Sequence, residues 1–213
     1  MLWVSFNPLR QINLRDNSMF QQLLQRLQHC NQVSARIGHA SHTELQQLKE
    51  QLSEQMGKPI GWHTMGLPAA ISTLGIILSF AIPQLWLGYI VMTGLNLPPQ
   101  QVFIWVVFTS LIFAAANAVT MFTIGKGSIT AVKMHLALSA ISLMLASAYL
   151  ICSLVAAVTS SYWAGSSVAA AITGSVMWLI SAGCIRSTAF YQMLLFALHN
   201  RVWRQSMQVS RRH

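Results

Sequence analysis

Acidic side chains are the scarcest feature of this sequence. Its 213 residues include only four Asp or Glu, and none follows Glu54 in the remaining three quarters of the chain. Charged residues make up 8% of the chain, whereas soluble domains usually carry about 25%. Hydrophobic residues make up 54%. This balance argues against an ordinary soluble domain and indicates an integral membrane protein.

Cysteine is also rare. The three cysteines, Cys30, Cys152 and Cys184, lie far apart, and no CxxC pair occurs. The sequence therefore predicts neither a disulfide framework nor a zinc site. Residues 1–16 contain no apolar run of the length that a signal peptide needs. We therefore expect the first membrane-spanning helix to direct insertion.

Catalytic motifs are missing as well. The sequence contains no G-x-S-x-G elbow, no H-E-x-x-H and no Walker glycine loop. The glycines and lysine of residues 125–128 are typical of a tight turn, because the strand and the spacing of a phosphate loop are missing. No catalytic, cofactor-binding or metal-binding residue is predicted, and we expect a protein that is not an enzyme.

Four long apolar stretches are present, at residues 67–92, 102–124, 134–158 and 166–185. Each reaches or exceeds the roughly 20 residues with which a helix crosses a bilayer. None contains Asp, Glu, Lys or Arg, which argues against small exporters that depend on a membrane carboxylate. The fold class predicted is an all-α integral membrane protein with a four-helix transmembrane bundle at residues 61–186.

The basic residues predict the orientation of the bundle. All thirteen Lys and Arg lie before the first stretch, between the second and third, or after the fourth. Because Lys and Arg are retained on the cytoplasmic side, both termini are expected in the cytoplasm, in a bacterial inner membrane. The net charge of +9 then suits anionic phospholipids rather than nucleic acid. The uncharged turns are flanked by a predicted aromatic belt, comprising Trp86, Tyr89, Trp105, Tyr162 and Trp163.

Two amphipathic segments flank the bundle. Residues 1–60 predict a cytoplasmic helical hairpin, with a first helix from Asp16 or Asn17 to Ile37 and a capping box, Ser41 with Glu44, opening the second. A hairpin this small cannot bury its apolar stripe alone, so we expect the stripe to rest on the inner face and loops of the bundle, on the membrane surface or on another subunit. Residues 187–213 predict a basic amphipathic tail, which either lies at the interface or extends the fourth span.

Small and polar residues inside the spans predict how the helices associate. Small residues four positions apart let membrane helices approach closely. Pro83 predicts a kink, with Gln84 as a compensating polar group, and Asn117 predicts a hydrogen bond to another helix. The predicted helix–helix contact residues are Gly75, Ser79, Ser110, Ala114, Asn117, Ala118, Ser142, Ala146, Ala170 and Gly174. More rows of small residues occur than one bundle needs, which favours neighbours in the membrane or a homo-oligomer.

Three histidines fall near the basic ends of the spans. His63, His135 and His199 could share one depth in the membrane, where three imidazoles could bind a metal. Haem-binding bundles place their histidines inside the spans, facing one another. Ordinary hydrogen bonding at the interface is the simpler expectation for these three.

The flanks carry a family resemblance. The chain has an amphipathic N-terminal segment, a compact set of spans and a basic tail that begins with Arg186 followed by Phe190, Tyr191 and Gln192. In this arrangement it resembles the IcmV/TraX-like inner-membrane subunits. The resemblance covers the two flanks. It implies a subunit of a type IVB secretion or IncI-type conjugation apparatus.

Three functions remain open. The first is a structural or accessory subunit of a multiprotein membrane assembly, whose partners are other membrane subunits. The second is an immunity or exclusion protein that acts through its uncharged turns, in which Asn96 and Ser161 lie. The third is a small oligomeric channel or carrier built around Pro83, Gln84 and Asn117.

Overall fold

The computed structural model describes residues 19–56, 66–98, 100–159 and 167–211. Within these ranges the chain is helical throughout, and its elements are α1 (Met19–His39), α2 (His42–Met56), α3 (Leu67–Ala81), α4 (Gln84–Gly94), α5 (Gln101–Gly125), α6 (Ile129–Val158), α7 (Val168–Arg186) and α8 (Thr188–Ser210).

The four predicted spans are confirmed as helices long and apolar enough to cross a membrane. They are Leu67–Gly94, Gln101–Gly125, Ile129–Val158 and Val168–Arg186. The third begins five residues before the predicted start, because Ser128 caps it through a bond from the backbone amide of Ala131. The chain is therefore a multi-pass membrane protein.

Pro83 divides the first span into α3 and α4. The proline ring removes one backbone donor, and a two-residue turn at Ile82 and Pro83 separates the helices. The predicted compensation by Gln84 is present, because its amide donates to the carbonyl of Phe80 at 3.4 Å and accepts from the Thr109 hydroxyl at 3.0 Å. The kink is thereby tied to α5.

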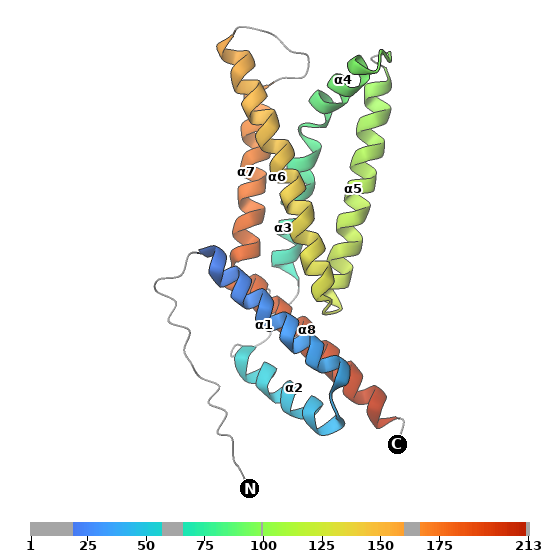
Figure 1. Cartoon of the computed structure of the whole chain (residues 1–213), viewed down its shortest axis with the longest axis vertical. Coiled ribbons are helices and arrows are strands. Elements are labelled where there is room, and N and C mark those ends of the chain that lie inside the picture. The colour runs from blue at the N-terminus through green and yellow to red at the C-terminus, as the bar shows by residue number, and fades with distance from the viewer. Residues whose placement is uncertain (1–18, 57–65, 99, 160–166, 212–213) are drawn as a thin grey trace.

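The other three spans surround α3. It packs most extensively on α7 and also contacts α5 and α6 (Figure 1). Helix α5 is the least buried span, with about a tenth of its most apolar window covered. Its large side chains, such as Phe103, Phe108 and Leu111, are more than 60% exposed, as suits contact with lipid tails.

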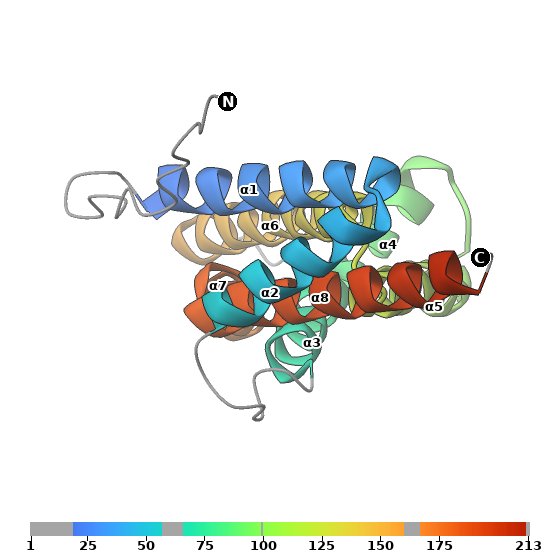
Figure 2. The same ribbon diagram turned by 90° about the horizontal axis from the view of Figure 1, so that it is seen from below.

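Helices α1, α2 and α8 gather beneath one end of the bundle. We call this the basic end, because the described Lys and Arg residues all belong to these helices or to the ends of the spans beside them, and we call the three helices the platform. Helices α1 and α8 run alongside each other, and α2 runs back across α8 (Figure 2). Both the predicted start of the second helix and its capping box are confirmed, since the Ser41 amide donates to the Glu44 carboxylate at 2.7 Å. The predicted cap at Asp16 or Asn17 lies outside the described residues.

Ser187 sets the direction of α8. Its hydroxyl donates to the carbonyl of Cys184 at 2.7 Å and accepts from the amide of Phe190 at 3.1 Å, so one side chain ends α7 and caps α8. The backbone of Ser187 is extended, with φ −65° and ψ 152°. Helix α8 therefore leaves the line of α7 and runs obliquely beneath the bundle, rather than prolonging the fourth span (Figure 1).

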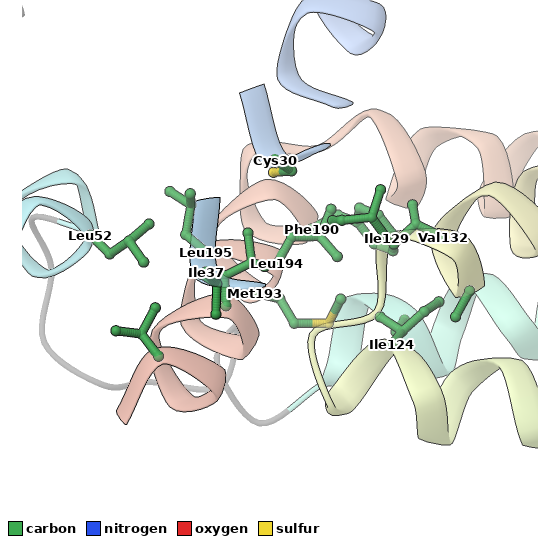
Figure 3. Close-up of a cluster of buried hydrophobic side chains, with 14 of the residues drawn as sticks. Cys30, Ile37, Leu52, Ile124, Ile129, Val132, Phe190, Met193, Leu194 and Leu195 are labelled. Carbon is green, nitrogen blue, oxygen red and sulfur yellow. The ribbon is translucent and has the colours of Figure 1, made fainter. Parts of the chain in front are cut away.

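The largest hydrophobic core lies between the platform and the basic end of the bundle (Figure 3). Water is excluded there, so apolar burial stabilises the fold, whereas inside a membrane lipid tails remove that driving force. Full burial of a side chain such as Phe190 or Leu198 is worth about 1.5–3 kcal/mol. The core consists of Cys30, Ile37, Leu45, Leu52, Ala69, Ile124, Ile129, Ala131, Val132, Phe190, Met193, Leu194, Leu195, Leu198 and Val202.

This core contains the apolar side chains of α2, whose packing partner the sequence left open. Leu45 and Leu52 of α2 are fully or nearly fully buried, with Leu48 and Met56 packed beside them. Helix α2 packs mainly on α8, and α1 packs on α8 and α6. The stripe of α2 is thus covered by the protein's own tail, whereas Leu24 of α1 stays exposed.

Candidate functional site

The interior of the bundle is rich in polar side chains. Within the described residues, every buried polar side chain belongs to a membrane-spanning helix. Such groups are costly in the membrane unless they are hydrogen-bonded, so they hold helices together or bind something polar. They are Ser72, Thr73, Ser79, Gln84, Asn117, Thr120, His135, Ser139, Ser142, Ser153 and Ser181.

Three of these residues form a cluster near the basic end. Ser72 of α3, His135 of α6 and Ser181 of α7 are completely buried. The Ser72 hydroxyl lies 2.8 Å from Nε2 of His135 and 3.1 Å from the Ser181 hydroxyl. The Ser181 hydroxyl also donates to the backbone carbonyl of Ser72 at 2.9 Å. This serine–histidine cluster joins three of the four spans.

Gly75 allows this close approach. A Cβ atom on Gly75 would lie 2.8 Å from the carbonyl oxygen of Met177 and 3.0 Å from Cβ of Ser181, closer than real contacts. The glycine therefore brings α3 and α7 near enough for Ser72 and Ser181 to bond. The sequence row of small residues predicted this contact, although not its partner.

The hydrogen bonds define the tautomer of His135. The single proton of Ser181 is used by the carbonyl of Ser72, so in the contact between the two hydroxyls Ser72 donates. In that arrangement Ser72 has no proton left for His135, and the tautomer that completes the network carries its hydrogen on Nε2 and donates it to Ser72. Nδ1 is left as an acceptor with no partner in the described structure. His135 is thus hydrogen-bonded near the basic end, as expected, but it is completely buried, and its ring stacks on that of Phe190 of α8 with the centroids 6.4 Å apart.

This geometry differs from that of a hydrolytic serine. A nucleophilic serine gives its proton to a histidine whose other nitrogen is oriented by a third group. Here Nδ1 of His135 has no partner in the described structure, so no third group orients the imidazole. The cluster is arranged to bind helices together.

Other cross-helix bonds follow the same principle. The Ser142 hydroxyl donates to the carbonyl of Ile76 at 3.2 Å, and the indole of Trp178 donates to the carbonyl of Ser139 at 3.0 Å. These bonds join α6 to α3 and α7. Bonds of this kind in membrane bundles average about 0.6 kcal/mol.

Several buried polar atoms make no protein hydrogen bond. Besides Nδ1 of His135, they include hydroxyls on α3 and α6 and the side-chain carbonyl of Asn117 on α5. The bond predicted from Asn117 to another helix is absent, since its amide donates to the carbonyl of Phe113 one turn earlier in α5. The side-chain NH₂ group of an asparagine can bond to a carbonyl of its own helix or of a neighbouring one. The sequence alone does not show which of the two bonds forms. The unpartnered hydroxyls are those of Thr73 and Ser79 on α3, Ser110 on α5 and Ser153 on α6.

The structure separates the predicted contact residues into two groups. Gly75, Ser79, Asn117, Ser142, Ala146 and Gly174 are buried between helices, and a Cβ on Gly174 would meet Ile82 at an ordinary 3.6 Å. Ser110, Ala114 and Ala170 are half-buried, and Ala118 is exposed. The row on α5 therefore lies at the edge of the bundle, and Ala118 alone of the three is exposed. Trp86 likewise does not sit in the aromatic belt, because it is buried against Tyr149 at 5.4 Å.

Arginines fasten the platform to the bundle. Arg26 of α1 donates to the carbonyl of Arg186 at the end of α7. Arg201 and Arg204 of α8 donate to the carbonyls of Gly127 and Lys126, directly after α5. Carbonyls at the end of a helix carry partial negative charge and lack intrahelical donors, so they favour a guanidinium. Sequence reasoning assigned these arginines only to topology.

Titratable groups of the platform are shifted toward their neutral forms. Burial raises the pKa of the Cys30 thiol to about 11. Burial, followed by the nearby Cys30, raises the pKa of Tyr191 to about 12 against the opposing effect of Arg26. Burial and then Arg36 lower the pKa of His29, and burial and then Lys49 lower that of His199. Near neutral pH the interior of the platform is therefore uncharged.

Two of the three histidines lie in the described part of the chain. His135 is in the bundle core, His199 is half-buried on α8, and His63 lies outside the described residues. The described ranges contain no group of three His, Cys, Asp or Glu side chains arranged to hold a metal ion. Comparison with protein-family models, curated proteins and solved structures gives no significant match.

Proposed function

We propose that the protein is a non-enzymatic structural or accessory subunit of a larger inner-membrane assembly, with both termini in the cytoplasm. The orientation is supported by the Lys and Arg residues of the described chain, which all lie at one end of the bundle. The resemblance of the flanks favours a secretion or conjugation apparatus as that assembly.

The observation that carries this proposal is the fixed attachment of the platform. Its apolar faces are used internally, and Arg26, Arg201 and Arg204 bond it to the ends of the membrane helices. A segment that only needed to be soluble would gain nothing from being held in one orientation to the membrane. A docking surface gains affinity from a fixed orientation, because a preorganised surface loses less entropy on binding.

The outward face of the platform suits a polar partner. Amide side chains both donate and accept hydrogen bonds without the desolvation cost of a charge. A hollow at the α1–α2 turn is lined partly by Gln47 and Gln51, beside Arg36, His39 and Glu44. The exposed glutamines of α1 and α2 are Gln21, Gln28, Gln32, Gln46, Gln47, Gln51 and Gln55.

The test compares two surfaces in the native host. The double variant Gln47→Ala with Gln51→Ala is expected to lower recovery of stoichiometric partner subunits at least tenfold, with the protein's own yield unchanged. Gln100→Ala, an exposed glutamine at the uncharged end, is the matched control. Partner loss with Gln100→Ala alone would move recognition to the opposite face and overturn the platform proposal.

A carrier for a small polar solute is the second candidate. It is supported by the unpartnered buried atoms of Thr73, Ser79, Ser153 and Asn117, which come from three spans. Buried polar groups without protein partners commonly bind water or a ligand. Solute flux into liposomes that falls when Asn117 and Gln84 are both replaced by Leu would favour this function, and flux that is unchanged would count against it.

A further inference from the structure

A hollow of about 360 Å³ lies at the uncharged end of the bundle, opposite the platform. It is formed where the last turns of α4 meet the first turn of α5, at the end far from α8 (Figure 1). Its volume falls within the range of small-molecule sites, which is about 300–1,000 Å³. The lining residues are Tyr89, Met92 and Thr93 of α4, Asn96 and Leu97 of the turn, and Val102 of α5.

Gly88 closes the membrane side of this hollow. A Cβ atom on Gly88 would lie 2.8 Å from Cδ1 of Trp105 and 3.2 Å from Cγ1 of Val102, so the missing side chain lets α4 touch α5. Val102 belongs to this contact and also lines the hollow. Met92 follows Gly88 by about one helical turn. The hollow therefore begins just beyond the contact, toward the end of the bundle.

Asn96 is held in a defined turn at the hollow. Its backbone is in the left-handed region, with φ 57°. The Asn96 amide donates to the carbonyl of Thr93 at 3.1 Å, and the Leu97 amide donates to the carbonyl of Met92 at 2.8 Å. In such a helix ending the left-handed residue is usually glycine and sometimes asparagine. Asparagine thus keeps the turn and adds an exposed side-chain amide to the lining.

The polar groups of the lining are neutral. They are the hydroxyls of Tyr89 and Thr93 and the side-chain amide of Asn96, each of which can both donate and accept hydrogen bonds. Thr93 and Asn96 are exposed and Tyr89 is 39% exposed, so a ligand can reach them. The described residues of α3, α4 and α5 include no Asp, Glu, Lys or Arg, so nothing there would pair with a charged ligand.

This lining suits a ligand with several hydroxyl groups. A hydroxyl both donates and accepts, so it can bond to Thr93 and to either atom of the Asn96 amide. The ring of Tyr89 offers an apolar surface to the C–H groups of a sugar ring. A small sugar combines these two kinds of surface in one neutral molecule.

We propose that this hollow binds a neutral sugar, with its hydroxyls on Thr93 and Asn96 and its ring against Tyr89. The sugar is either free or the headgroup of a glycolipid, because the end of a span is within reach of both water and lipid headgroups. The hollow lies at the opposite end of the bundle from the platform. The sugar site therefore goes beyond the proposed function and does not rest on it.

The experiment measures binding of glucose and of N-acetylglucosamine to the full-length protein by saturation-transfer NMR, in phosphatidylcholine nanodiscs that contain no sugar. Wild type is expected to bind at least one of the two saturably. Asn96→Gly keeps the left-handed turn but removes the side-chain amide, and it is expected to weaken binding about fivefold, as the loss of one neutral hydrogen bond does. Tyr89→Leu removes the ring but keeps an apolar side chain, and it is expected to weaken binding by about the same factor.

Gln100→Ala is the matched control, because Gln100 is an exposed amide at the same end that does not line the hollow. Its affinity is expected to stay within about twofold of wild type. Equal weakening by Asn96→Gly and Gln100→Ala would overturn the proposal, by showing contact with the surface in general. The absence of saturable binding of either sugar to wild type would also overturn it. Circular dichroism checks that each variant is folded, and Tyr89→Leu supplies the comparison if Asn96→Gly is not.

The two sources of the sugar are distinguished by adding a glucosyl diacylglycerol to the nanodiscs. Displacement of the bound free sugar by this lipid in wild type would support a glycolipid headgroup as the ligand. Unchanged binding of the free sugar beside the lipid would support a free sugar.

Discussion

Replacement of Gly75 by Ala tests the contact between α3 and α7 directly. The added methyl would lie 2.8 Å from the carbonyl oxygen of Met177 and 3.0 Å from Cβ of Ser181. Both atoms are fixed by the α7 backbone, so the helices must separate by a few tenths of an ångström. Such overpacking costs about 1–3 kcal/mol.

The separation also affects the serine–histidine cluster. It lengthens the two bonds between Ser72 and Ser181, which are 2.9 and 3.1 Å long. At about 0.6 kcal/mol each, their loss adds about 1 kcal/mol, for a total of about 2–4 kcal/mol.

Gly183→Ala is the matched control for this prediction. Gly183 is also a glycine within a membrane helix, and a Cβ there would have no neighbour within 4 Å. The gain in helix propensity from Gly to Ala is common to both variants and cancels in their difference. Unfolding by SDS titration in mixed micelles, followed by circular dichroism, gives both free energies. Equal stability of the two variants would refute the close α3–α7 contact and the role assigned to Gly75.

Three further predictions concern the cluster and the platform. Ser72→Ala removes the hydrogen-bond partner of Nε2 of the buried His135 and is expected to lower the free energy of unfolding by about 1–3 kcal/mol in the same titration. Ser147→Ala is the control, because the Ser147 hydroxyl bonds only within its own helix, and it should change little. Leu198→Ala, at a completely buried position of the platform core, is expected to cost about 2–5 kcal/mol and to expose α8 to limited proteolysis, and a protease-resistant variant would contradict the packing. Cys30 is expected to react with a water-soluble maleimide at pH 8 at least about 100-fold more slowly than in the denatured protein, since its raised pKa of about 11 leaves little thiolate. The folded thiol binds its proton more tightly than the unfolded one, so the associated stability is present below pH 9 and is lost as the pH rises toward 11, which unfolding at pH 8 and pH 11 can check.

The local features of this fold could be predicted from sequence. Four apolar runs become four membrane-spanning helices, because length and hydropathy decide membrane insertion residue by residue. The capping box at Ser41 and the break at Pro83 also follow from short-range chemistry. Each of these predictions depends on a few neighbouring residues.

The rotation of each helix could not be predicted in the same way. Small residues occur around much of the circumference of α5 and α6, so spacing does not reveal which row faces the bundle. Ala118 turns to the outside while Ser142 and Ala146 turn inward. The pairing of Ser72 with His135 depends on the rotation of two helices at once, and the two residues are 63 positions apart.

The hydrogen bonds that attach the platform to the bundle could not be predicted from the sequence either. Its arginines bond to backbone carbonyls, and such acceptors have no signature in sequence. The amphipathic stripe of α2 predicted that Leu45 and Leu52 would be buried, but self-packing and a partner surface were equally compatible with it.

The mass and composition of the protein extracted from its native host test the central claim most directly. A tag on the C-terminus, mild detergent and native mass spectrometry would give the subunits and their ratio in one measurement. The proposed function predicts a particle that contains other membrane subunits in fixed stoichiometry. A monomer or a homo-oligomer would contradict it and move the assignment to the carrier.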